Sequence, residues 1–226
     1  MKHFFLITLL LFCSSVIKSQ VITIEYNLGY GCYSMSHLKE YIKESQKRIP
    51  FNIKTTDNFP NFLTHEVRIG YSIEKHHLGI LYAFQNTVAQ NHLADYSGEY
   101  KHTIKINGHK IGVFERFTLT NIKNIDLYVE LAGGMIINNL NNNIVFSLEG
   151  IGKEYQKEDL NGVNYFLQPS LGMIYKLSSW LGINFNVGYE YNILNKMRLD
   201  HQETNIRSDW SGLRLNMGII TSFKIR

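Results

Sequence analysis

The chain has 226 residues and a formal net charge of +4, with 44% hydrophobic residues, 19% charged residues and 3 prolines. This length and composition are typical of one β-rich domain with a full core. The small net charge argues against a nucleic-acid-binding protein, and two cysteines are too few for a cysteine metal site.

The first nineteen residues have the pattern of a secretory signal peptide. Lys2 precedes an apolar run over residues 4–13, and a short polar stretch follows with Ser19 near its end. The run is too short for a membrane helix, and we expect cleavage after Ser19. Residues 20–226 then carry a formal charge of +2 and one cysteine, Cys32, so no intramolecular disulfide is expected. No later stretch approaches eighteen consecutive apolar residues.

The remaining sequence alternates between apolar and polar residues in eight segments. Over residues 22–31, isoleucine, tyrosine and leucine at even positions alternate with threonine, glutamate, asparagine and glycine at odd positions. A period of two residues is that of a β-strand with one apolar and one polar face. The fourth segment is the least regular, because Glu115 shares a face with Ile111 and Val113. The predicted strands are 21–33, 62–73, 77–88, 109–119, 125–135, 163–177, 181–191 and 209–225.

The connections between these strands alternate between short and long. Short turns lie around Lys75, Lys123 and Ser178. Because successive strands are antiparallel, this alternation places every short turn at one end and every long loop at the other, as in outer-membrane barrels. The first long loop also contains a predicted short surface helix that begins at Ser36. The predicted long loops are 36–61, 85–108, 137–162 and 192–208.

The composition of the polar faces predicts which face points inward. They are rich in glycine, asparagine and serine, which suit the crowded interior of an eight-stranded barrel. The apolar faces would then contact lipid, and the strands must close into a ring because an open edge leaves backbone groups unpaired in hydrocarbon. The sequence therefore predicts an all-β fold, an eight-stranded antiparallel up-and-down transmembrane β-barrel. Predicted aromatic girdles comprise Tyr30, Tyr165, Tyr189 and Tyr191 at the outer rim, and Tyr71, Phe117, Tyr175 and Phe223 at the inner rim.

Charged residues on the inward face are predicted to pair with one another. Charges in a narrow lumen must pair or stay hydrated, so we expect a structural salt-bridge network that closes the pore. No spacing singles out two carboxylates as a catalytic pair, and no motif indicates a cofactor or metal site. Asp126 and Arg116 share the inward face. The predicted network comprises Glu25, Glu66, Arg68, Glu130, Lys176, Glu190 and Arg214.

The last predicted strand contains NMGIITSF, which resembles the C-terminal assembly signal of outer-membrane proteins at Asn216, Gly218 and Phe223, with Thr221 in place of the first aromatic residue. Together with the signal peptide, the strand count and the loop alternation, this motif resembles the small outer-membrane β-barrel domain family of Gram-negative bacteria, in a Bacteroidetes-like form. The GYGCYSM segment that ends the first strand is similar to members of that family. The resemblance implies an outer-membrane location, a monomer, contacts with outer-membrane lipid and insertion by the barrel assembly machinery.

Lipopolysaccharide is a further expected partner. Basic residues of the predicted loops could bind its phosphates, and simple solvation explains them equally well. These residues are Lys39, Lys43, Lys47, Arg48, Lys101, Lys105 and Lys110.

The leading functional hypothesis is a non-enzymatic barrel whose outer loops serve envelope structure or surface binding. A first alternative is transport of a small or hydrophobic solute across the outer membrane. A second is a lipid A modifying enzyme, because lipid A deacylases of this architecture use histidine and serine on the outer wall, where His65 is predicted to lie. No serine lies two residues from His65, which favours an interfacial histidine without a catalytic role.

Overall fold

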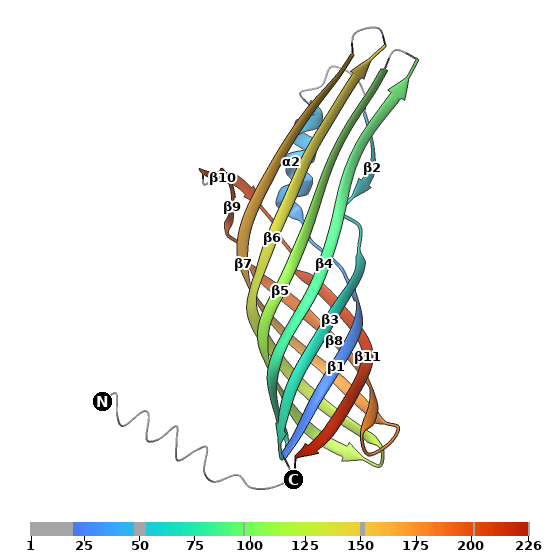
Figure 1. Cartoon of the computed structure of the whole chain (residues 1–226), viewed down its shortest axis with the longest axis vertical. Coiled ribbons are helices and arrows are strands. Elements are labelled where there is room, and N and C mark those ends of the chain that lie inside the picture. Colours follow the sequence, from blue (N-terminus) through green and yellow to red (C-terminus); the bar gives the residue numbers. More distant parts are fainter. Residues whose placement is uncertain (1–19, 48–52, 97, 150–151, 201, 226) are drawn as a thin grey trace, which may run out of the picture.

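The computed structural model describes residues 20–47, 53–96, 98–149, 152–200 and 202–225, and the predicted signal peptide lies outside these ranges. Within them, eight antiparallel strands form a closed ring in which β1 pairs with both β3 and β11 (Figure 1). The fold is therefore the predicted all-β barrel. The ring strands are β1 (Gln20–Gly31), β3 (Phe62–Ile73), β4 (His76–Asp95), β5 (Gly98–Ile122), β6 (Ile125–Leu148), β7 (Gly152–Lys176), β8 (Leu181–Ile193) and β11 (Gly212–Ile225).

The polar faces of the strands point inward, as the composition predicts. In β1, Ile24 and Tyr26 are each 45% exposed on the outside of the barrel, whereas Glu25 and Asn27 between them are completely buried. The outward side chains of the other strands are also mostly apolar, including tyrosines of both predicted girdles such as Tyr165 and Tyr175. A surface of this kind is stable against hydrocarbon and not against water.

Half of the barrel is much longer than the other half. β4 to β7 contain 20 to 25 residues each, against 12 to 14 for β1, β3, β8 and β11. The four long strands continue far beyond the ends of the short ones (Figure 1). We call this part of β4 to β7 the extension, the end of the barrel that carries it the extended end, and the opposite end the short-turn end.

Two of the predicted long loops are therefore wrong. Residues 85–108 and 137–162 instead continue the β4–β5 and β6–β7 hairpins in register to within a few residues of their tips. The alternation of side chains persists, but the apolar side chains change face: in β5, Ile111 and Val113 point outward, whereas Ile104 and Ile106 are buried on the inner side. The apolar side chains change face because the outer face meets lipid in the barrel but water in the extension, where the apolar core lies on the inner face.

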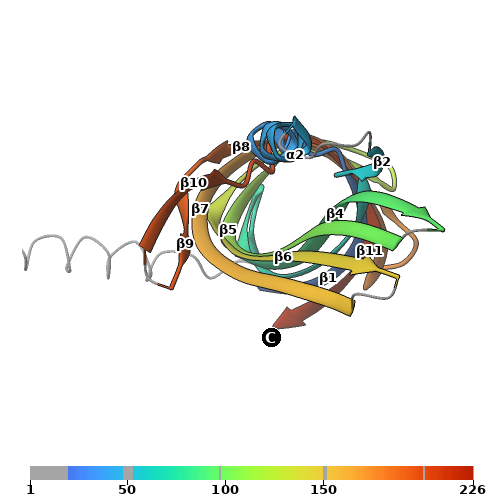
Figure 2. The same ribbon diagram turned by 90° about the horizontal axis from the view of Figure 1, so that it is seen from above.

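That core lies on the concave side of the extension. The predicted helix, α2 (Ser36–Lys47), does begin at Ser36, but it is not a simple surface helix, because Leu38 and Ile42 are buried against the inner faces of the long strands. Viewed along the barrel, α2 lies across the concave side of the long strands (Figure 2). The core includes Met35, Leu38, Ile42, Phe59, Ile104, Ile106, Ile136, Leu140, Leu160, Met197 and Trp210.

Short strands pair with part of each edge of the extension. β2 (Lys54–Asn58) pairs with β4 beyond the point where β3 ends. At the other edge, β9 (Lys196–Leu199) and β10 (Gln202–Arg207) form a hairpin, and Arg198 of β9 pairs with Asn161 of β7. In the described part of the chain, no helix is long and apolar enough to span a membrane.

Candidate functional site

The barrel interior contains a buried group of five charged residues, which we call the lower cluster. Arg116 donates hydrogen bonds of 2.8 and 3.1 Å to the two carboxylate oxygens of Glu25, and its guanidinium lies 3.0 Å from Glu130. Arg68 bonds to Glu66 at 2.7 Å and to Glu130 at 2.6 Å. Each of the five residues is at most 4% exposed. A bidentate arginine–carboxylate contact such as that between Arg116 and Glu25 holds both side chains in a fixed relative geometry.

Aromatic rings and amides complete the surroundings of the lower cluster. The guanidinium of Arg116 lies 4.2 Å from the ring centre of Tyr128, a distance suited to a cation–π contact. The Tyr128 hydroxyl donates a 2.6 Å hydrogen bond to Asn184, whose amide donates to Glu25 at 3.3 Å. Strands β1, β3, β5, β6 and β8 are thus joined across the lumen by one continuous set of polar contacts.

A second group, the upper cluster, lies toward the extended end. Glu190 accepts hydrogen bonds from Lys110 at 2.9 Å and from Arg214 at 3.0 Å. Asn192 donates to the same carboxylate at 3.0 Å, and Lys110 also bonds to the amide oxygen of Gln168. Arg214 is held further by the backbone carbonyl of Cys32, at 2.8 Å.

The charges of the two clusters balance each other. With ordinary protonation states, the lower cluster has three carboxylates and two guanidinium groups, and the upper cluster has one carboxylate and two cations. The net charges of −1 and +1 sum to zero for the whole interior. In both clusters, each charged side chain lies within 3.0 Å of one of opposite charge.

Sequence and structure differ at three members of this network. Lys176 does not join it: its amine bonds to Asp126 at 2.6 Å and is 43% exposed at the mouth of the short-turn end. Arg116, for which the sequence predicts only an inward position, is the central donor. Lys110 is counted among the predicted loop cations although it lies at the start of the predicted strand 109–119, and it is 3% exposed inside the barrel. Its even position, in phase with Phe114 and Arg116, is the signal that could have found it.

Of the remaining predicted loop cations, Lys39, Lys43 and Lys47 lie on α2, four residues apart. Lys101 and Lys105 lie on the outer face of the extension, and Arg48 lies outside the described residues. Adjacent histidines behave as alternation requires: His77 is buried with its ring 2.7 Å from the Thr23 hydroxyl, and His76 lies outside, 3.0 Å from Glu115. Among the described residues, no group of three potential ligands could hold a metal ion.

Above the upper cluster, apolar packing closes the interior. Trp210 is fully buried, contacts Tyr33 edge to face at 4.9 Å between ring centres, and donates a 2.7 Å hydrogen bond to Asn138. The core of the extension continues from there. Near its far end, burial lowers the pKa of His102, whose ring lies 2.7 Å from the Asn142 side-chain oxygen.

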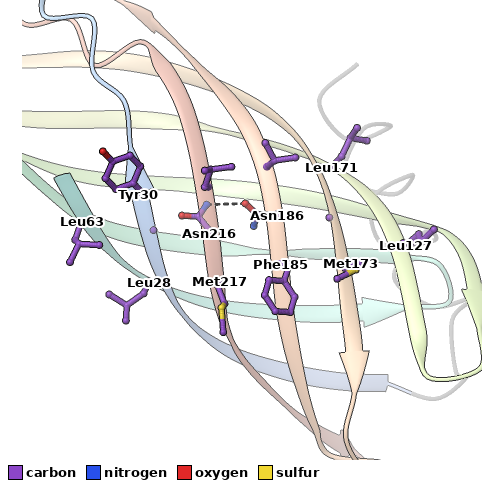
Figure 3. Close-up of a pocket in the computed structure, with 14 residues that line it drawn as sticks. Leu28, Tyr30, Leu63, Leu127, Leu171, Met173, Phe185, Asn186, Asn216 and Met217 are labelled. Carbon is purple, nitrogen blue, oxygen red and sulfur yellow. Dashed lines mark hydrogen bonds between the residues drawn. The ribbon is translucent and has the colours of Figure 1, made fainter. Parts of the chain in front are cut away.

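The outer wall carries a shallow apolar groove of about 680 Å³, lined mainly by β1, β7, β8 and β11, with Leu63 of β3 and Leu127 of β6 at its margins. Leu171, Met173, Phe185 and Met217 line it from the lipid-facing side (Figure 3). The groove also touches inward-facing positions. The side chains of Asn186 and Asn216 bond to each other there at 2.9 Å.

The residues of the predicted assembly signal occupy both faces of β11. Asn216 points inward to Asn186, and Phe223 is 53% exposed on the outside. At Gly218, the Cβ atom of any other residue would collide with the backbone oxygen of Tyr26, so only glycine fits between β11 and β1. Recognition of these residues during assembly stays a prediction of the sequence.

His65 lies on the outer wall as predicted. Its Nδ1 atom is 2.8 Å from the hydroxyl of Tyr26 on the neighbouring strand. A tyrosine partner of this kind holds an interfacial imidazole in place, and among the described residues no serine hydroxyl is hydrogen bonded to it.

Known structures share this architecture. No family model matches the sequence, and no curated protein matches it. The outer membrane protein OprG from Pseudomonas aeruginosa is 12% identical, with a TM-score of 0.51 over 93% of this chain and 99% of that chain. Neisserial surface protein A is also 12% identical, with a TM-score of 0.42 over 90% of this chain and 97% of that chain.

At these identities the likeness shows the fold. The closed ring, the apolar outer wall and the paired interior charges explain physically why this fold suits a lipid bilayer. The chain is therefore an outer-membrane β-barrel of the type found in Gram-negative bacteria.

Proposed function

We propose that the protein is a non-enzymatic outer-membrane barrel whose extended end serves envelope structure or binding at the cell surface. The observation that carries this proposal is the combination of a closed interior with a large folded extension. The lower and upper clusters pair their charges, and Trp210 and the apolar core close the space above them. A chain that closes its own lumen and also builds a large folded sheet beyond the lipid-facing wall is suited to present a surface outside the membrane.

Conductance is expected to be absent or very small. Eight strands leave room for side chains only, and both clusters cross that space. A depression of about 360 Å³ at the short-turn end has the buried His77 and Arg116 in its lining. Purified protein in planar bilayers should show no stable large channels, and such channels from the wild-type protein would contradict the proposal and favour solute transport.

The extended end is expected to face the outside of the cell. Tyr96, at the β4–β5 tip, is 92% exposed, and Ser178 lies in an exposed turn at the other end. In a Cys32→Ser background, Tyr96→Cys should react with a membrane-impermeant maleimide on intact cells, whereas Ser178→Cys should react only after lysis. The reverse pattern would invert the orientation.

A deletion strain tests the proposed function directly. Loss of the protein should change surface binding or envelope resistance to detergent, and the wild-type gene should restore both. Lipid A, compared by mass spectrometry with and without the protein, should be unchanged. A lipid A species that appears only with the protein would instead support the enzyme hypothesis.

Transport of a hydrophobic solute is the second candidate, and the groove in the outer wall favours it. Its lining is mostly apolar and includes the lipid-facing Phe185 and the inward-facing Asn186. However, β8 and β11 are paired without interruption from Leu181 to Glu190, so the wall has no lateral opening between these two strands. Uptake of an alkane or fatty acid that depends on the protein would favour this candidate over the first.

The remaining expectations belong to the same proposal. They are a signal peptide over residues 1–19, a chain from residue 20 to 226 with extracellular connections at the extended end, a monomeric state and a Bacteroidetes-like affiliation. Expected partners are outer-membrane lipid, lipopolysaccharide and the barrel assembly machinery.

A further inference from the structure

Four asparagines form a straight row across the outer face of the long strands. In the strand register, Asn86 of β4 pairs with Asn107 of β5, Asn107 with Asn139 of β6, and Asn139 with Asn161 of β7. At the usual spacing between strands, the row is about 14 Å long. All four residues are at least partly exposed. Within the described ranges, none of their side-chain amides is hydrogen bonded to another residue.

The row lies where the lipid-facing wall ends. Two residues closer to the short-turn end, the same register aligns Phe84, His109, Ile137 and Val163, and the next outward row is Tyr82, Ile111, Met135 and Tyr165. Two residues in the other direction, the outward row is Val88, Lys105, Asn141 and Asp159. The amide row is thus continuous with the membrane surface of the protein, and its partner must sit at the height of the lipid headgroups.

A cleft of about 1020 Å³ lies at the β7 end of the row, between β7 and the β9–β10 hairpin. The hairpin stands outside β7 when the barrel is viewed along its axis (Figure 2). Asn161 belongs to the lining, and Ile137, Val163 and Tyr165 supply an apolar part that continues the lipid-facing wall. The charged lining residues are Lys196, Arg198 and Arg207 together with Asp159, Asp200 and Glu203.

The balance of these groups indicates the chemistry of the ligand. Three basic and three acidic residues give the cleft no net charge, so it does not select a purely anionic ligand. A primary amide both donates and accepts hydrogen bonds, and a row of them matches a run of hydroxyl groups. The apolar part of the cleft requires a ligand that also carries hydrocarbon.

We propose that the amide row and this cleft bind the sugar portion of a membrane-anchored glycolipid, lipopolysaccharide in the outer leaflet. The acyl chains lie against Ile137, Val163 and Tyr165, and the core sugars attached to lipid A lie along the four asparagines. The inference rests on the proposed function in one respect, since it requires the extended end to face outward.

The test compares lipid-linked and free sugars. Full-length folded protein in detergent is titrated with lipopolysaccharide carrying its core sugars, with lipid A lacking them, and with free core oligosaccharide, and complexes are counted by native mass spectrometry. Wild-type protein should bind the core-bearing lipid at least tenfold more tightly than either of the others. Asn107→Ala combined with Asn139→Ala should weaken that binding about tenfold, through two lost hydrogen-bonding groups, and leave lipid A binding unchanged.

Asn61→Ala is the matched control, because Asn61 is an exposed asparagine outside the row and should have no effect. Asn161→Ala, a single change in the cleft lining, provides a second variant should the double variant fold poorly. Equal binding of the two lipids, or full binding by the folded variants, would overturn the proposal. Equally tight binding of the free oligosaccharide would overturn the lipid-anchored part. The binding measurements do not depend on conductance or on a cell phenotype. Failure of this proposal can therefore be distinguished from failure of the proposed function.

Discussion

Replacing Arg116 with alanine should lower the free energy of unfolding by about 3–5 kcal/mol, the usual cost of removing one partner from a buried ion pair. Arg116 is 1% exposed and is the link between Glu25 and Glu130. Its removal leaves the three carboxylates of the lower cluster with one guanidinium, that of Arg68, which bonds to Glu66 and Glu130 but not to Glu25. The loss should be measured by urea unfolding of protein folded into lipid vesicles.

Two further variants separate charge from packing. Arg198→Ala, at a side chain that is 64% exposed, should change stability by less than about 1 kcal/mol. Glu25→Gln in the Arg116→Ala background should recover part of the loss, because it removes one of the unpaired charges. An Arg116→Ala protein as stable as the wild type would show that the lower cluster does not stabilise the barrel.

Phe185→Arg should destabilise the barrel by about 2–4 kcal/mol, the cost of a cation near the bilayer midplane. Phe185 lies near the middle of β8, on the lipid-facing side between Met173 and Met217 (Figure 3). Water surrounds the side chain in the unfolded state and hydrocarbon surrounds it in the folded state, so the guanidinium loses hydration on folding. Unfolding in vesicles of defined thickness measures the difference.

The adjacent residue is the control for this prediction. Asn186→Ser removes one hydrogen bond, to Asn216, and keeps a small polar side chain inside the barrel, so its cost should be about 1 kcal/mol. A Phe185→Arg protein that unfolds like the wild type would mean that the apolar face does not meet lipid.

The membrane-spanning part of the fold could be predicted because one face of every strand there meets lipid and the other face meets the barrel interior. Ile24 and Glu25 differ in polarity since one meets lipid and the other the lumen. The extension could not be read in the same way, because its apolar residues change to the inner face. Ile104 and Ile106 still alternate with Thr103, Lys105 and Asn107, but many lysines and asparagines made the segment resemble a loop.

The sequence predicts which residues point into the barrel better than it predicts which of them bond to each other. Inward positions follow from alternation, which is why Glu25, Arg68 and Glu190 were found. Which charges meet depends on how far each strand is shifted against the next, and sequence alternation carries no information about that shift. The bond between Glu25 and Arg116, 91 residues apart, is an example. Lys110 was missed for a different reason, since the predicted boundary between strand and loop fell beside it.

The covered edges of the extension have a consequence for the membrane as a whole. All copies of an outer-membrane protein have the same orientation. The extensions of neighbouring copies therefore lie at the same height above the membrane, with their sheet edges facing one another. Bare margins would join such sheets into continuous ribbons. Because β2 pairs with β4 over Ala89–His92 and β9 pairs with β7 at Asn161, the part of each edge nearest the membrane is already occupied, which opposes the joining of neighbouring molecules into a ribbon.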